Sequence, residues 1–483
     1  MKKFICLLFC LFLLPFTACN TESEELATYE ITAKLNQDMS VDCQMSYTFT
    51  NQVKDLSAIY FTLYPNAFSS EAEVRPVFES EKTFAYPNGE SYGGVEIVKV
   101  TDDSKSLPYE ISGKNEQTLK VGFEKSLKQG ETKKIYIKFK VTLPNVKHRF
   151  GYADNTVNLT GFYPVACVYE NDKYYENVYY PAGDPFYSQV ANYKVNLTVP
   201  SSYSVASSMQ AEKTEWSGDE TKYYYNRDNV RDIAFVLSEK FNVIENEYGN
   251  VTVKYYYFND KNPEKTLDVA GQSLTFFSEN YFKYPYSEYV VAEGDFLYGG
   301  MEYPCLSLIS CTVEGSERDY TVAHETAHQW FYGIIGVNQN EIGFLDEGLT
   351  EYSTVFYLSQ QKNAEKSYSK YIQEAKSTYL NLRQALIYSG NTLPPIMNRH
   401  LKDFKSNLEY VMIAYDRSLI MIDEIKTELG DKKFNKFLKE FVCKNAYKNV
   451  TVKDFSQALE KKSKRASDKF NSFVNGEAVI KAD

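Results

Sequence analysis

Two histidines four residues apart are the strongest candidates for chemistry in this chain. Residues 321–330 read TVAHETAHQW and contain His324, Glu325 and His328 in the pattern HExxH. If this segment is a helix, residues i and i+4 share one face, so both imidazoles can bind one metal ion at about 2.0–2.1 Å. Glu325 is rotated by about 100° around the helix, where its carboxylate can address a water on the metal instead of the metal. The pattern predicts a zinc site with Glu325 as general base.

A catalytic zinc needs a third protein ligand and an open fourth position. One common arrangement places a third histidine six residues after the second, but position 334 is Ile334. The other route supplies a carboxylate from a following helix. Residues 344–352, FLDEGLTEY, offer Asp346, Glu347 and Glu351. The residues alone leave open which of these carboxylates is the ligand.

At this point the sequence resembles the aminopeptidase N family of zinc metallopeptidases, within the gluzincins. The resemblance rests on HExxH, on residues 346–349 (DEGL) after it and on residues 299–303 (GGMEY) before it, in the family's order and spacing. It implies that Glu347 is the third ligand and that each chain holds one Zn²⁺. Asp346 and Glu351 then become carboxylates of the helix surface or partners of the ligands.

The resemblance assigns substrate binding to Gly299, Gly300, Met301 and Glu302. In the family, the glutamate of Gly-x-Met-Glu-Asn binds the N-terminal ammonium of the substrate, a role that would fall to Glu302. Such a carboxylate forms a charge-assisted hydrogen bond that fixes where the peptide ends. Tyr303 stands where the family has Asn, so the contact of that Asn is not carried over. The alternative is a tight turn before a strand, since Gly-Gly and Pro mark turns.

A downstream tyrosine is the candidate for oxyanion stabilisation. The family uses a Tyr in a Tyr-x-Lys-Gly segment that opens an apolar helix. Residues 414–422, AYDRSLIMI, are similar, with Arg417 and Ser418 at the Lys and Gly positions. We therefore expect Tyr415 to donate to the developing negative charge, with Tyr410 as its nearest rival.

Together these residues predict an aminopeptidase that hydrolyses the N-terminal bond of peptide substrates. Glu325 would take the proton of a zinc-activated water and return it to the leaving amine, while Tyr415 stabilises the oxyanion. One alternative is a zinc endopeptidase of the same fold, favoured by Tyr303 and by the lack of the helical-repeat domain that covers the cleft in many members. A less favoured alternative is an inactive, peptide-binding lipoprotein.

The elements that position these residues change along the chain. Alternating apolar and polar runs, for example at residues 134–141 and 193–199, predict half-buried strands. From Asn262 onward the pattern is mainly helical, with Pro263 at a helix start. The fold class expected is multidomain α+β.

The predicted domains follow from this change of pattern. Residues 28–245 would form an all-β saddle or sandwich domain. Residues 246–483 would form a mainly helical zinc metallopeptidase domain, which the resemblance implies is thermolysin-like.

The start of the chain predicts export and anchoring. Two lysines precede an apolar run at residues 4–16 that is too short to span a bilayer, so residues 1–18 read as a signal peptide. Residues 16–19, FTAC, resemble a bacterial lipobox, which would make Cys19 the lipidated first residue of an acidic tether over residues 19–27. Two acyl chains suffice for stable anchoring. The expected location is the extracytoplasmic cell surface, with ordinary secretion as the alternative.

Composition bounds the remaining possibilities. The chain has 483 residues, a formal charge of −11 and 43% hydrophobic residues, which is typical of globular proteins. An acidic chain repels phosphate backbones, so nucleic acid is not an expected partner. The cysteines after Cys19 are odd in number and lack paired CxxC spacing, so we expect isolated thiols. The oligomeric state stays open.

Overall fold

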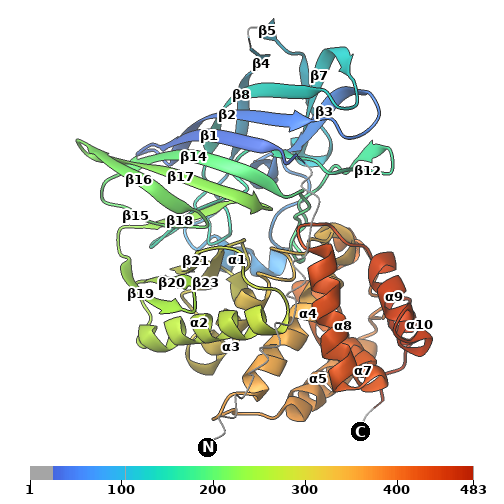
Figure 1. Ribbon diagram of the computed structural model, residues 1–483. Helices are drawn as coiled ribbons and strands as arrows, with labels where there is room; N and C mark the ends of the chain where they lie inside the picture. The colour runs from blue at the N-terminus through green and yellow to red at the C-terminus, as the bar shows by residue number, and fades with distance from the viewer. Residues whose placement is uncertain (1–24, 104, 482–483) are drawn as a thin grey trace, which may run out of the picture.

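The computed structural model describes residues 25–103 and 105–481, with strands in the N-terminal half and mostly helices in the C-terminal half (Figure 1). The predicted signal peptide and Cys19 lie outside the described residues. Within those two ranges, the helices are all too short or too polar to cross a bilayer. The arrangement confirms the α+β prediction.

An eight-stranded sheet dominates the N-terminal half. Its strands pair antiparallel except for β1 and β14, which are parallel. The order is β16 (Gln210–Ser217), β17 (Glu220–Val230), β14 (Ala191–Pro200), β1 (Thr28–Leu35), β2 (Ser40–Thr50), β8 (Thr132–Thr142), β4 (Gly94–Asp102) and β5 (Lys105–Ser106). Buried and exposed residues alternate along β1 and β14, as predicted for half-buried strands.

Smaller sheets complete this half. One contains β15 (Ser204–Ser207), β18 (Ala234–Ser238), β10 (Val157–Thr160) and β9 (Gly151–Tyr152). Another contains β11 (Val165–Ala166), β3 (Leu56–Thr62), β7 (Thr118–Leu127) and β6 (Tyr109–Ser112), and a hairpin joins β12 (Tyr169–Glu170) to β13 (Lys173–Tyr174). Helical structure in the described part of this half is confined to the short elements η1 (Tyr64–Phe68), η2 (Glu79–Glu81), α1 (Lys82–Ala85) and η3 (Lys114–Glu116).

The C-terminal half begins with a five-stranded sheet and continues with helices. The sheet order is β19 (Asn242–Tyr248), β20 (Val251–Tyr257), β21 (Glu288–Gly294), β23 (Leu306–Ser310) and β22 (Gly300–Met301). Residue 245, the predicted domain boundary, lies within β19. The helices are α2 (Pro263–Asn280), α3 (Gly315–Ala327), α4 (Gln339–Ser359), α5 (Tyr368–Tyr388), η4 (Leu401–Asp403), α6 (Asn407–Val411), the π-helix η5 (Met412–Arg417), α7 (Ser418–Leu429), α8 (Asp431–Asn445), α9 (Val452–Glu460) and α10 (Lys464–Val474).

The two halves share a continuous core. One apolar cluster includes Tyr193 of the large sheet together with Leu308 and Tyr332 of the C-terminal half. The buried guanidinium of Arg231 donates to the carbonyl oxygens of Ser188 at 2.7 Å and Tyr332 at 2.9 Å. This contact holds the segment that follows α3 against the β-sheet half. Cys43, Cys167, Cys305 and Cys311 are free thiols, as expected.

Candidate active site

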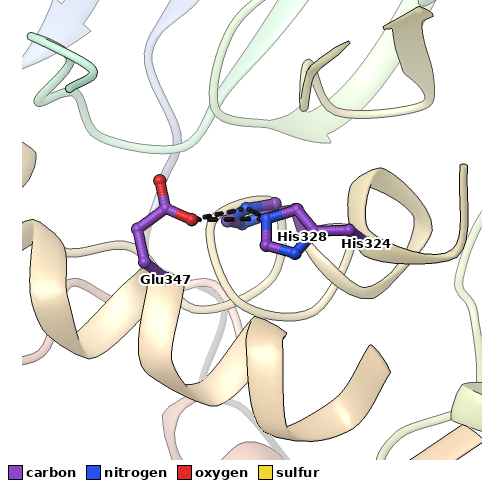
Figure 2. Close-up of side chains that lie close together, drawn as sticks. All are labelled: His324, His328 and Glu347. Atoms are coloured by element: carbon purple, nitrogen blue, oxygen red, sulfur yellow. Dashed lines mark hydrogen bonds and ion pairs between the residues drawn. The ribbon is translucent and has the colours of Figure 1, made fainter. Parts of the chain in front are cut away.

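Three ligand atoms meet where α3 packs against α4 (Figure 2). α3 carries His324 and ends at its C-cap residue His328, and α4 carries Glu347. The two Nε2 atoms lie 3.1 Å apart, and each lies 3.3 Å from Glu347 Oε2. Ligands at about 2.0–2.1 Å from a tetrahedral zinc ion lie about 3.3 Å from one another. Two imidazoles and a carboxylate at this spacing fit a zinc ion.

The other ring nitrogens are held by acceptors, which fixes the orientation of both imidazoles. His324 Nδ1 lies 2.9 Å from Glu351 Oε2. His328 Nδ1 lies 2.8 Å from the carbonyl oxygen of Phe331 and 3.0 Å from Asp346 Oδ1. Both Nδ1 atoms therefore donate, which leaves the Nε2 lone pairs free for a metal. Asp346 and Glu351 act as partners of the ligands, one of the two roles expected for them.

The charges around the imidazoles favour a cation at this point. Burial lowers the pKa of His324, but hydrogen bonds to Glu347 and Glu351 outweigh burial and raise it to about 9. Burial also opposes ionisation of Glu347, yet His328 and His324 outweigh it and hold the pKa of Glu347 at about 2. A proton on an imidazole or a bound metal ion would supply the positive charge that these carboxylates favour. Zinc, which takes nitrogen and oxygen ligands, suits the donor set.

Glu325 lies beside the ligands on α3, with its carboxylate against the backbone of Gly300. A Cβ atom at residue 300 would approach Glu325 Oε1 to 2.3 Å, so the carboxylate keeps this position only while residue 300 is glycine. Glu325 Oε2 is buried and meets no hydrogen-bond partner among the described residues. Burial raises the pKa of Glu325 to about 7. A carboxylate with a pKa near neutrality can both accept and return a proton.

The segment GGMEY divides between the cleft and the core. Gly299, Gly300 and Glu302 line the cleft. The side chain of Met301 is fully buried in the core, and Met301 is not among the residues that line the cleft. Tyr303 also turns inward, and its hydroxyl lies 2.8 Å from Thr160 Oγ1 in the β-sheet half. The segment is thus the edge strand β22 and its continuation, not only a turn.

Tyr415 lies on the π-helix η5 and reaches the ligand set. Its hydroxyl donates to Glu347 Oε1 at 2.7 Å, and its ring stacks on His324 with centroids 5.6 Å apart. π-Helical turns occur frequently at functional sites. Tyr410 also lines the cleft, but its hydroxyl packs against Gly343 of α4, where a Cβ would lie 2.7 Å away.

Except for Met301 and Glu347, the predicted site residues line one cleft of about 380 Å³, a volume suited to a small ligand. The β-sheet half contributes Arg149 and Asp184, whose buried side chains form an ion pair at 2.8 Å. A third residue that the motifs did not indicate is Gln339, which contacts both Glu302 and Asp346. The cleft is lined by Arg149, Gly183, Asp184, Tyr298, Gly299, Gly300, Glu302, Tyr320, Thr321, His324, Glu325, His328, Glu351, Asn407, Tyr410, Val411 and Tyr415.

Comparison with known proteins agrees with this geometry. Residues 265–476 match the Peptidase family M1 domain. Aminopeptidase M1-B of Oryza sativa subsp. japonica is 26% identical over 56% of this chain and 33% of its own length. Probable aminopeptidase 2 of Sulfurisphaera tokodaii is 24% identical over 77% of this chain and 47% of its own length. The chain thus spans about a third to a half of these relatives.

A solved structure shares nearly the whole fold. The M1 zinc metallopeptidase from Deinococcus radiodurans superposes with a TM-score of 0.69 at 16% sequence identity, covering 94% of each chain. The matched family domain contains HExxH, Glu347 and Tyr415. Residues 265–476 therefore form a peptidase family M1 domain, in agreement with the predicted resemblance to the aminopeptidase N family.

Proposed function

We propose that this protein is a zinc-dependent aminopeptidase that removes single residues from the free N-terminus of peptides. The observation that carries the proposal is that the histidine ligands, Glu325 and Glu302 all open on the same cleft. The relatives named above as aminopeptidases support it.

The metal would be held by His324, His328 and Glu347. When bound there, zinc would lower the pKa of a water toward about 7 and polarise the scissile carbonyl. Glu325 would accept the proton of the attacking water, because it lines the cleft and its Oε2 has no protein partner among the described residues. The same carboxyl would then return the proton to the leaving amine.

The hydroxyl of Tyr415 would donate a hydrogen bond to the developing oxyanion. It already lies beside the ligand set, at 2.7 Å from Glu347 Oε1. The ring of Tyr415 stacks on His324, and this contact limits the movement of the Tyr415 side chain. Tyr415 would therefore act without a large rearrangement.

The preference for a free N-terminus would come from two carboxylates that line the cleft, Glu302 and Asp184. Glu302 is buried, and burial together with Asp184 raises its pKa well above the ordinary value. An ammonium group is the natural partner for such buried acidic groups, since an unpaired buried charge is costly. The α-amino group would dock here and place the first peptide bond beside Glu325.

The experiment compares zinc-loaded protein with Glu325→Gln and with the matched control Glu317→Gln, an exposed carboxylate on the same helix. Glu325→Gln should bind one zinc per chain and lose at least about 10²-fold in turnover. Glu317→Gln should behave like the unmodified protein. Full turnover by zinc-loaded Glu325→Gln would contradict the proposal.

We also propose that the protein is exported and anchored at the cell surface through a lipid on Cys19. The support is the sequence of residues 1–27 alone, which combines a short apolar run, FTAC and an acidic stretch. Cys19→Ala should move the protein from the membrane fraction to the soluble fraction. Retention of the variant in the membrane fraction would contradict the anchor.

A further inference from the structure

We infer that Gln339 is a positioning residue that connects Glu302, which would bind the substrate amine, to the metal site through hydrogen bonds. This inference rests on the proposed function. The side chain of Gln339 is 2% exposed, at the first residue of α4. Its Nε2 donates to Glu302 Oε1 at 3.0 Å and to Asp346 Oδ2 at 2.8 Å. Asp346 Oδ1 in turn accepts from His328 Nδ1 at 3.0 Å.

The donor atoms of Gln339 match this task. A side-chain amide has two N–H donors, and here each meets one carboxylate. The opposite orientation of the amide would turn its oxygen toward two acceptors. Gln339 Oε1 is buried and has no hydrogen-bond partner among the described residues. The orientation of the side-chain amide is therefore set by the two hydrogen bonds that its Nε2 donates. Charge-assisted bonds of this kind are about twice as strong as neutral ones.

Gln339 also sits where three segments meet. Its backbone N–H donates to the carbonyl oxygen of Phe186, in the β-sheet half, at 3.3 Å. Its side chain reaches Glu302 after β22 and Asp346 on α4. α4 is interrupted between these positions, since Ile342 has non-helical dihedral angles. The side-chain bond to Asp346 therefore links the two parts of α4 across the interruption.

The two hydrogen bonds from the Gln339 amide, to Glu302 and to Asp346, would have two effects on the proposed chemistry. The amide uses one oxygen of Glu302 and leaves the other for an ammonium group. It also holds Asp346 on His328, which orients the Nε2 lone pair of that ligand. Ligand atoms of Glu302, His328 and Asp346 all lie within 4.8 Å of one another, so the amide separates two carboxylates that would otherwise repel across a short distance.

The test uses Gln339→Met, which keeps the length and removes the donors, and Gln339→Glu, which keeps the shape and offers only acceptors. Ser353→Ala is the matched control, because it removes a buried 2.8 Å hydrogen bond to Tyr281 further along α4. Thermal melting shows which variants are folded. Zinc affinity is measured by chelator competition, and KM and kcat are measured with a peptide that has a free N-terminus.

Both Gln339 variants should bind zinc about 10- to 100-fold more weakly, as expected for the loss of a ligand's hydrogen-bonded support. At saturating zinc, KM should rise at least tenfold while kcat changes less. The double variant with Glu302→Gln and Gln339→Met should have a KM no higher than that of Glu302→Gln alone. Ser353→Ala should leave both quantities unchanged.

Zinc affinity within twofold of the unmodified protein in folded Gln339→Met would overturn the link to the metal site. An unchanged KM in that variant would overturn the link to Glu302. Wild-type behaviour of Gln339→Glu would show that donation is not its role. If the unmodified protein cuts no peptide, the proposed function fails, while the zinc measurement still decides the metal half of the inference.

Discussion

The carboxylate of Glu325 lies against the backbone of Gly300, so closely that a Cβ atom at residue 300 would stand 2.3 Å from Glu325 Oε1 and 2.6 Å from its Cδ. Both residues belong to predicted motifs, but the motifs do not say that they touch. Because Gly300 belongs to β22 and Glu325 to α3, this contact sets the position of the proposed base relative to the sheet edge.

Gly300→Ala should therefore displace Glu325 and lower kcat at least about 100-fold, because a misplaced general base loses most of its contribution. Zinc content should stay at the wild-type value, since the ligands are untouched. Gly299→Ala is the control: its Cβ would meet only Thr321, at 3.7 Å, and should be tolerated. Equal activity of both alanine variants would contradict the role given to this contact.

Glu351 should contribute to metal affinity without binding the metal. It accepts from His324 Nδ1 at 2.9 Å and also from the hydroxyl of Tyr320. Glu351→Gln keeps the size and removes the charge, so zinc affinity should fall about 10- to 100-fold. Chelator competition measures this change, and Glu341→Gln, an exposed residue of the same helix, supplies the comparison. An unchanged affinity would show that the Glu351 contact is not needed.

Tyr415 and Tyr410 can be separated by removing each hydroxyl. Tyr415→Phe should lower kcat about 10²- to 10³-fold with little change in KM, as expected for an oxyanion donor. Tyr410→Phe should lower kcat less than tenfold, because that hydroxyl packs against Gly343. Steady-state kinetics of the two variants at saturating zinc decide between them. The reverse order of effects would assign the donor role to Tyr410.

The sequence contained the parts of the site that lie close together along the chain. HExxH placed His324, Glu325 and His328 together on α3 and at its end, and the family resemblance implied Glu347, on α4, as the third ligand. The alternating pattern anticipated β8 and β14, and Pro263 begins α2 as predicted. Local periodicity and short motifs carry this information, because each depends on neighbouring residues alone.

The remaining parts of the site depend on contacts between distant segments. Asp184 lines the cleft from the β-sheet half, where it pairs with Arg149, and no short spacing links the two. Gln339 joins Glu302 to Asp346 only once the start of α4 lies against the segment that follows β22. The π-helical turn that carries Tyr415 has no simple residue signature either. Such features follow from tertiary packing.

Buried His148 should make the protein less stable in acid. Its pKa is held well below 6.5 by burial and by Arg149, so the folded state keeps the ring neutral. The unfolded chain takes up a proton as the pH falls below about 6.5, and the free energy of unfolding drops by about 1.4 kcal/mol per pH unit. Above pH 6.5 the ring of His148 is neutral in both the folded and the unfolded state, so its burial does not reduce stability. The loss of stability develops as the pH falls from 6.5 toward the folded pKa of His148.

The measurement is urea unfolding of the unmodified protein and of His148→Asn at pH 7.5 and pH 5.5. His148 Nδ1 accepts from the N–H of Arg149 at 2.9 Å, and the asparagine oxygen can take over that bond. The variant should be less stable at pH 7.5, and the difference between the two proteins should shrink by about 1 kcal/mol at pH 5.5. A constant difference would show that His148 does not titrate on unfolding.

The central claim is that the cleft cuts peptides at a free N-terminus, and its most direct test is a time course of products by mass spectrometry. The substrates are one peptide and its N-acetylated twin, and the enzymes are zinc-loaded unmodified protein and Glu302→Gln. The account predicts stepwise loss of single residues from the free peptide, no cleavage of the acetylated one, and a large rise in KM for Glu302→Gln. Internal cleavage of both peptides at similar rates would contradict it and identify an endopeptidase.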